Sequence, residues 1–213
     1  MDSNSLNSSD SDNDNFQINT VQTKKFSYKC VPFIYYQYYE DIKDLENSNK
    51  IILPQKILDN LSLMRGLVFP LHFKINNSEI LFTPSDFRQD INEIYISNHF
   101  LENLSLNIDE IVELTYLNYP IEKGSKIKLK PHTSNFLEIM DQKQYLEENL
   151  VKLYTTLTIG QTILIPYFEN IILIDVIDCS PNKTISIIDT DLEVDFEQPW
   201  DYKEPEKPKI NEK

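Results

Sequence analysis

Near its C-terminal end the chain alternates acidic side chains with apolar or hydroxyl side chains. Carboxylates in series can exchange protons, hold a cation or orient a basic partner. In an extended strand successive side chains point to opposite faces, so the alternation predicts a strand over 189–196 with one acidic face. The run has neither the glycine nor the terminal glutamate of a calcium loop. We therefore expect a solvated acidic row that can steer a basic partner, formed by Asp189, Asp191, Glu193 and Asp195.

The histidines and cysteines do not form the patterns of catalytic or metal sites. His72, His99 and His132 show no metal-ligand spacing, and each is expected to have a structural role. Cys30 and Cys179 belong to no C-x-x-C pair, so we expect neither a zinc module nor a disulfide framework. Buried, unreactive thiols are the expectation for both. The sequence thus predicts no catalytic residue, no metal site and no cofactor.

One alternative from another class of protein rests on the same acidic run. Asp189, Thr190 and Asp191 are similar to the aspartic-protease triplet, but Asp191 occupies the position where that triplet requires glycine. An acidic-site hydrolase would use Asp189 and Asp191 as carboxylates that share a proton or hold a metal ion. The alternatives predict different surroundings, because a docking face must be exposed and shallow whereas an enzyme needs the pair inside a cleft.

Composition excludes several classes of binding protein. The chain has 213 residues, with 20 basic and 34 acidic side chains and a formal net charge of −14. A protein that binds by neutralising phosphates is therefore not expected, and we predict no nucleic-acid partner. The glycines are only Gly66, Gly124 and Gly160, so neither a Walker loop nor a dinucleotide fingerprint can be assembled.

Composition also divides the chain into segments. Residues 1–23 are rich in Ser, Asn and Asp and predict a disordered acidic tail without a targeting signal, and 201–213 read as an exit linker. Between them we expect a folded body in two parts, 24–120 and 124–200. The most apolar window, 162–177, is interrupted by polar residues and is too short to cross a bilayer, so no membrane insertion is expected.

Short β-branched or aromatic runs dominate the body, and a few segments have helical spacing. The first part predicts strands over 31–39, 71–75, 79–82, 93–97 and 111–119, and helices over 54–66 and 98–104. The second part predicts a strand over 126–130, a helix that begins at Asp141, a hairpin of 162–167 with 171–177, and strands over 184–188 and 189–196. The fold class is therefore mainly β with α+β character.

Several stretches, in order along the chain, resemble the N-terminal domain of the ubiquitin fusion degradation protein 1 family. They are KIILP at 50–54 with LDNLS at 58–62, FPLHFK at 69–74, FLEI at 136–139, LEENL at 146–150, LTIG at 157–160, SIIDTDLEVDF at 186–196 and YKEP at 202–205. Each stretch alone is weak, whereas the ordered set covers most of the chain. The chain departs from the family at Asn47, Ser48 and Asn49, which stand in a turn where glycines are usual.

The resemblance implies a double-psi β-barrel over 24–120, followed by a smaller α+β roll over 124–200. It also implies a non-catalytic adaptor that binds ubiquitin and polyubiquitin chains. With a subunit of the nuclear protein localisation protein 4 type, such an adaptor serves a valosin-containing AAA ATPase in ER-associated degradation, and its contacts with both lie outside this chain. The acidic row of Asp189, Asp191, Glu193 and Asp195 would then face the basic rim of ubiquitin's apolar patch.

The implied location is the cytoplasm, at the cytosolic face of the ER, and the nucleus. The resemblance leaves open a second version of the family. A symbiont-derived copy serves protein import across a secondary plastid membrane, in the periplastid compartment. The Asn- and Ile-rich composition and the unusual N-terminal segment keep this alternative open.

Overall fold

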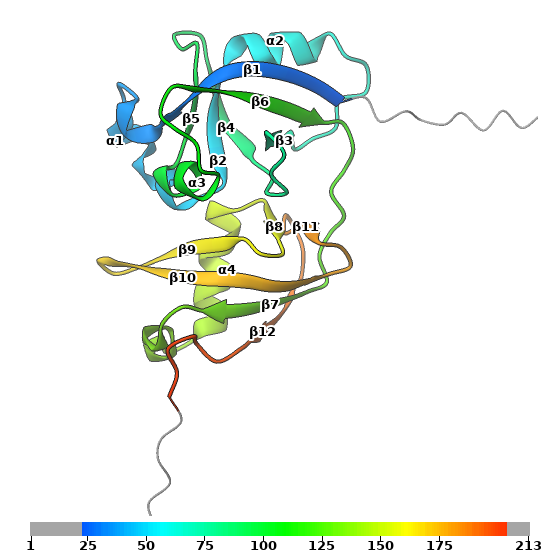
Figure 1. Cartoon of the computed structure of the whole chain (residues 1–213). Helices are drawn as coiled ribbons and strands as arrows, with labels where there is room; N and C mark the ends of the chain where they lie inside the picture. The colour runs from blue at the N-terminus through cyan, green and yellow to red at the C-terminus, as the bar shows by residue number, and fades with distance from the viewer. Residues whose placement is uncertain (1–22, 204–213) are drawn as a thin grey trace, which may run out of the picture.

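The computed structural model describes residues 23–203, which form two β-sheet units stacked along the length of the molecule (Figure 1). The first unit is a six-stranded sheet in the order β3-β6-β1-β5-β2-β4. Its two edges meet where Phe73 and Phe82 exchange backbone hydrogen bonds of 2.9 and 2.8 Å, which closes the sheet into a barrel. The strands are β1 (Thr23–Pro32), β2 (Lys50–Pro54), β3 (His72–Ile75), β4 (Thr83–Arg88), β5 (Ile94–Ile96) and β6 (Glu110–Leu117).

The helices that cover the barrel begin at residues that commonly start helices, proline and serine. Pro54 precedes α2 (Gln55–Ser62), whose Ile57 and Leu61 are buried one turn apart. The Ser97 hydroxyl accepts the Phe100 N–H and caps α3 (Asn98–Asn103). The remaining helices of this unit are α1 (Tyr39–Ile42) and the short 3-10 helices η1 (Phe33–Tyr35) and η2 (Lys43–Asn47).

The second unit packs one long helix against a four-stranded sheet in the order β12-β7-β10-β9. Asp141 Oδ1 accepts the Gln144 N–H at 3.0 Å and caps that helix, α4 (Gln142–Leu153), while Leu146 and Leu150 are buried against the sheet. The other elements are β7 (Lys126–Pro131), η3 (Ser134–Glu138), β8 (Thr156–Thr158), β9 (Thr162–Tyr167), β10 (Asn170–Ser180), β11 (Thr184–Ser186) and β12 (Glu193–Phe196).

The two units share one continuous apolar core, and buried polar groups join them. Asn49 is fully buried and donates from Nδ2 to Leu81 O at 2.9 Å and to Thr156 Oγ1 at 3.3 Å. Nearby, Lys50 Nζ donates to Lys152 O at 2.6 Å. Of these hydrogen bonds, those of Asn49 with Thr156 and of Lys50 with Lys152 cross between the units.

The fold class is confirmed: a β-barrel is followed by a smaller α+β unit. Two strand predictions were wrong in detail. The strand predicted over 31–39 is instead β1, Thr23–Pro32, which overlaps the prediction only at its last two residues; beyond Pro32 the chain forms short helices, because proline has no N–H to give to a sheet. No strand forms over the predicted 79–82, where only Phe82 pairs, as an isolated bridge with Phe73, and β4 begins after it at Thr83.

The final strand is shorter than the alternation predicts, because β12 covers only Glu193–Phe196. Apart from Thr23, which begins β1, the predicted tail over 1–23 lies outside the described residues, and the predicted linker over 201–213 is described only to Lys203. Between residues 23 and 203, none of the helices has both the length and the apolar composition needed to cross a bilayer.

Candidate functional site

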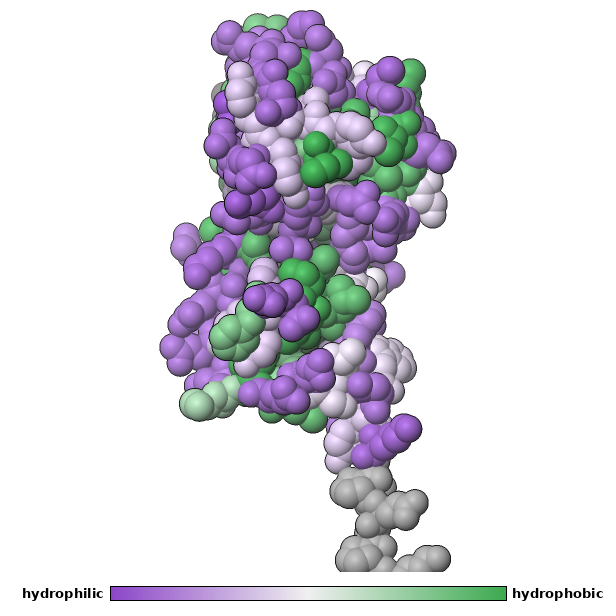
Figure 2. Space-filling model, turned by 90° about the vertical axis from the view of Figure 1, so that its left-hand side faces the viewer, coloured by the Kyte–Doolittle hydropathy of each residue, from purple (hydrophilic) through white to green (hydrophobic). Residues whose placement is uncertain are grey.

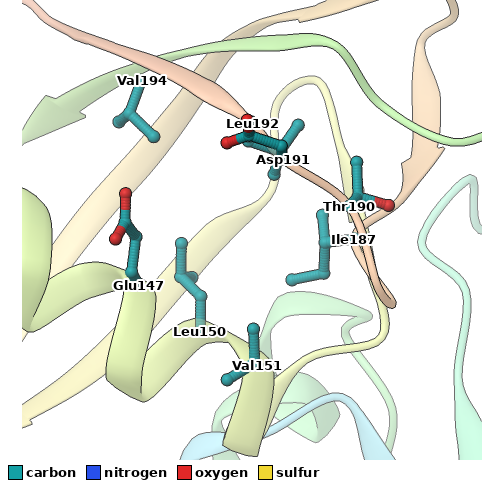
Figure 3. A pocket seen from close by; sticks show the side chains of 8 residues that line it. All are labelled: Glu147, Leu150, Val151, Ile187, Thr190, Asp191, Leu192 and Val194. Atoms are coloured by element: carbon teal, nitrogen blue, oxygen red, sulfur yellow. The ribbon is translucent and has the colours of Figure 1, made fainter.

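The segment that connects β11 to β12 forms one wall of a groove along α4 (Figure 3). The groove has a volume of about 340 Å³, and most of its floor is aliphatic. It is called the α4 groove here, and it is lined by Glu147, Leu150, Val151, Ile187, Thr190, Asp191, Leu192 and Val194. In Figure 3 the carboxylates of Glu147 and Asp191 extend from opposite walls beside the aliphatic side chains. The α4 groove is therefore an apolar surface with acidic groups at its rim.

Local structure explains why the groove stays open. Asp189 adopts a left-handed backbone conformation with φ of +47°, and the Thr190 hydroxyl donates to Ile188 O at 2.9 Å. This turn carries the chain away from β11. The chain joins the four-stranded sheet only at Glu193, where β12 begins to pair with β7. On the opposite wall, Val151 lies outside the buried stripe of α4 and is 62% exposed. Apolar groups thus face each other without filling the space between them.

The four residues of the predicted acidic row have different surroundings. Asp191 lines the α4 groove, whereas Asp189 lines two neighbouring hollows. Lys126 Nζ lies 3.1 Å from Glu193 Oε1 and 2.8 Å from Asp195 Oδ2. The strand predicted over 189–196 is wrong for its first four residues, so the four carboxylates do not form one continuous row.

Lys126 compensates much of the negative charge on β12. Its ammonium lowers the pKa of the Asp195 carboxyl below its ordinary value. Next to it, Lys128 and Lys130 both approach Glu197, at 3.5 Å each. In the described part of the chain, neither Asp189 nor Asp191 has a basic side chain within ion-pair distance, so these two remain able to pair with a basic partner.

One of the two hollows beside Asp189 lies where the two units meet, and the other lies within the second unit. One has a volume of about 220 Å³ and is lined by residues of both units, including Phe69, Pro70 and His72. The other, of about 370 Å³, includes Thr155. A polar chain joins them, because His72 Nδ1 lies 3.1 Å from Thr83 Oγ1, which lies 2.6 Å from Thr155 Oγ1.

Burial makes His72 and both cysteines unreactive, and a carboxylate orients His132. Burial lowers the pKa of His72 to about 4, so its ring is neutral at physiological pH. Burial raises the pKa of both Cys30 and Cys179 to about 12, so neither is a thiolate nucleophile. His132 Nε2 lies 2.8 Å from Asp175 Oδ1, which also accepts the Thr162 hydroxyl at 2.7 Å.

The arrangement of these groups is suited to binding an apolar surface with basic groups around it. Among residues 23–203, no three His, Cys, Asp or Glu side chains are grouped closely enough to hold a metal ion. Asp189 and Asp191, the pair required by the hydrolase alternative, are both exposed instead of enclosed in a cleft. One hollow beside Asp189 adjoins the α4 groove and shares Val151, Ile187 and Thr190 with it. Aliphatic groups on two walls with carboxylates at the rim match a partner of opposite charge.

Of the four predicted binding residues only Asp191 lines the α4 groove, and the sequence did not indicate the groove's aliphatic residues as part of a site. Val151 carried a signal, because it falls outside the buried helical stripe and is apolar at a position expected to face solvent. Leu192 and Val194 were expected on the inner face of the final strand, and both line the groove. Nothing in the sequence indicated that these three residues would meet.

Comparisons with known proteins identify the relatives of this chain. A family model described as ubiquitin fusion degradation protein UFD1, N-terminal subdomain 1, matches residues 24–120, and the model for N-terminal subdomain 2 matches residues 123–199. Ubiquitin recognition factor in ER-associated degradation protein 1 from Mus musculus is 34% identical over 176 residues, covering 79% of this chain and 55% of that protein.

Two further relatives come from distant organisms. Ubiquitin fusion degradation protein 1 homolog from Dictyostelium discoideum is 33% identical over 168 residues, covering 77% of this chain and 50% of that protein. Ubiquitin fusion degradation protein 1 from Saccharomyces cerevisiae is 28% identical over 196 residues, covering 89% of this chain and 53% of that protein. The chain thus spans about half the length of the curated relatives it matches.

Proposed function

Because the chain belongs to the ubiquitin fusion degradation protein 1 family, we propose that it is a non-catalytic domain that binds ubiquitin and ubiquitin chains. The observation that carries this proposal is the match of both units to the family's N-terminal subdomains, together with a mammalian relative named as a ubiquitin recognition factor. The chemistry of the α4 groove supports it, since an apolar floor with a carboxylate rim suits the apolar patch and basic rim of ubiquitin.

In this proposal the domain recruits ubiquitylated substrates for a AAA ATPase of the valosin-containing type. It would act with a subunit of the nuclear protein localisation protein 4 type in ER-associated degradation, at the cytosolic face of the ER. Contacts with those two partners are proposed to lie outside the two matched subdomains. The name of the mouse relative, which refers to ER-associated degradation, supports this location.

The proposed ubiquitin site is the α4 groove, with Asp191 and Glu147 at its rim and Val151 on the α4 wall. Asp189 would extend the acidic surface toward the junction between the units. Glu193 and Asp195 already pair with Lys126, so their share in orienting ubiquitin is smaller than the sequence suggested. The solvent-exposed groups at the rim should set orientation and association rate more than total affinity.

The test is a titration of the whole chain with mono-ubiquitin and with ubiquitin chains, followed by NMR or calorimetry. Asp191→Lys should weaken binding because it places a like charge against a basic partner, and Val151→Ser should weaken it by removing apolar contact. The matched control is Asp59→Lys, which makes the same charge change on α2, at the far end of the barrel from α4 (Figure 1).

Three outcomes are distinguishable. Saturable binding that both groove variants weaken and Asp59→Lys leaves unchanged would support the function and the site. Binding that is unaffected by Asp191→Lys and Val151→Ser would keep the function and discard the site. A folded chain that binds neither mono-ubiquitin nor ubiquitin chains at several hundred micromolar would overturn the proposed function, and turnover of a peptide substrate that requires Asp189 and Asp191 would support the hydrolase instead.

A further inference from the structure

A second hollow lies on a different flank of α4, between that helix and the tip of the β9–β10 hairpin. It has a volume of about 330 Å³ and is called the tip hollow here. Its lining is largely apolar and aromatic, with Ile139, Met140, Tyr145, Tyr167 and Phe168, and its polar members are Asp141, Gln144 and Glu148. No residue is shared with the α4 groove, so a partner could occupy each at the same time.

The apolar groups of the tip hollow are unusually exposed. Phe168 is 88% exposed at the hairpin tip, and the side chain of Met140 is fully exposed. Figure 2 views the molecule from the side toward which the hairpin tip points, and hydrophobic residues gather over the lower unit there with hydrophilic residues around them. Exposed apolar groups that are grouped in this way, instead of scattered singly, mark interaction surfaces.

Three aromatic rings pack against one another at this surface. The rings of Tyr145 and Tyr167 meet edge to face with centroids 5.4 Å apart, and those of Tyr167 and Phe168 do so at 4.7 Å. The Tyr145 hydroxyl donates to Pro166 O, which ties α4 to the hairpin. The packed rings of Tyr145 and Tyr167 therefore offer a preformed aromatic face beside the exposed Phe168 ring.

The backbone conformation at Phe168 also indicates that its side chain has a binding role. Tyr167 pairs with Asn170, so Phe168 and Glu169 form a two-residue turn, and Phe168 has φ of +51°. Glycine and asparagine tolerate this left-handed conformation best, whereas a bulky side chain there is strained. A strained residue with an exposed aromatic ring is a candidate for a binding role.

The ionisable groups at the tip hollow are all acidic. Asp141 and Glu148 line it, and the exposed Glu169 is next to Phe168 in the hairpin turn. Glu148 accepts a hydrogen bond at 3.0 Å from the neutral Gln144 amide, and Asp141 caps α4. Within the described residues none of these three carboxylates lies within ion-pair distance of a basic side chain, so their charge is available to a ligand.

We propose that the tip hollow docks a short segment of a partner protein in which an aliphatic or aromatic anchor is flanked by lysine or arginine. The anchor would contact Phe168 and Met140, and the basic side chains would pair with Asp141, Glu148 and Glu169. A second copy of this chain is disfavoured as the occupant, because the chain carries a net charge of −14 and dimerisation here would bring carboxylates together. An anionic membrane is disfavoured for the same reason.

The probe is a random peptide library displayed on phage and selected against the whole chain. Enriched peptides are then synthesised, labelled and titrated by fluorescence anisotropy. We expect them to carry an apolar anchor and a net positive charge. Phe168→Asn should weaken their binding at least about tenfold, the loss expected when an anchor is removed, and Glu148→Lys should weaken it as well. Asparagine tolerates the left-handed backbone, so Phe168→Asn should not lower the unfolding temperature.

The control and the contrary outcomes make the test decisive. Val151→Ser, in the α4 groove, should leave the affinity of the selected peptides unchanged. The proposal is overturned if no peptide is enriched, if enriched peptides are acidic, or if their binding ignores both Phe168→Asn and Met140→Ser. It is also overturned if the Phe168-dependent event is self-association in sedimentation, or adsorption to phosphatidylcholine vesicles.

Discussion

Replacing Gly124 with alanine should destabilise the fold through one defined steric conflict. A Cβ at this position would lie 2.4 Å from Ile185 Cδ1 and 2.8 Å from Leu192 Cδ2. Carbon atoms in contact are about 3.5 to 4.0 Å apart, so the Ile185 side chain must move by about 1 Å or the backbone must shift. The nearby Gly124 N–H donates to Ser186 O at 2.9 Å, which restricts that shift.

The magnitude follows from the cost of overpacking a core. Gly124→Ala should lower the free energy of unfolding by about 1 to 3 kcal/mol. Ile185→Val removes the nearest atom, Cδ1, and should cost about 0.5 to 1.5 kcal/mol alone. In the double variant the two substitutions relieve each other, so the total loss should be smaller than the sum by about 1 kcal/mol or more.

The assay is equilibrium unfolding in urea for the two single variants and the double variant. One core runs through both units, so we expect a single cooperative transition. The control is Gly66→Ala, where φ is +71° and no atom lies within 4 Å of an added Cβ. Its cost is backbone strain of about 1 to 2 kcal/mol, which Ile185→Val should not relieve. Additive losses for Gly124→Ala and Ile185→Val would refute the steric argument.

Three further predictions concern pH and hydrogen bonding. The pKa of His72 is lowered to about 4 by burial, below its value in the unfolded chain, so stability should be constant above about pH 6.5 and fall toward pH 4 by at most about 1.4 kcal/mol per pH unit. His72→Gln should flatten that part of a stability–pH curve, and an unchanged slope would contradict the assignment. Lys126→Ala should raise the lowered pKa of Asp195 toward its ordinary value in an NMR titration of carboxyl carbons, and a pKa that does not move would show that another group causes the shift. Tyr154→Phe leaves the Leu164 N–H, which donates to the buried hydroxyl at 2.8 Å, without its partner, and urea unfolding should show a loss of about 1 to 3 kcal/mol; a neutral effect would mean that this N–H finds another acceptor.

Local patterns predicted most of the elements, because their causes are local. The Asp141 cap, Leu146 and Leu150 place α4 within about a turn of its observed bounds. The alternation of lysine with Ile127 and Leu129 predicted β7, and both aliphatic residues are fully buried. Where the local signal was ambiguous the prediction failed, as in the aromatic run that follows Pro32, which forms short helices instead of a strand.

The acidic run shows that a periodic pattern of side chains does not by itself determine where a strand begins. Alternation predicted a strand from Asp189, but the left-handed turn at that residue delays pairing until Glu193, where β7 provides a partner strand. Strand formation depends on a neighbouring strand as well as on side-chain order. The partner strand β7 also determines the surface charge, since its Lys126 pairs with Glu193 and Asp195 but not with Asp189 or Asp191.

The order of residues alone was enough to predict the class of fold, the family and the acidic character of the chain, because these follow from composition, local periodicity and an ordered set of short motifs. The candidate binding surfaces depend on contacts between distant segments. Val151 faces Leu192 across the α4 groove because α4 packs against the β11–β12 connection. Met140 and Phe168 both line the tip hollow because α4 also packs against the β9–β10 hairpin. No short-range pattern encodes which side chains face one another across such a distance, so only the packed fold could bring these surfaces together.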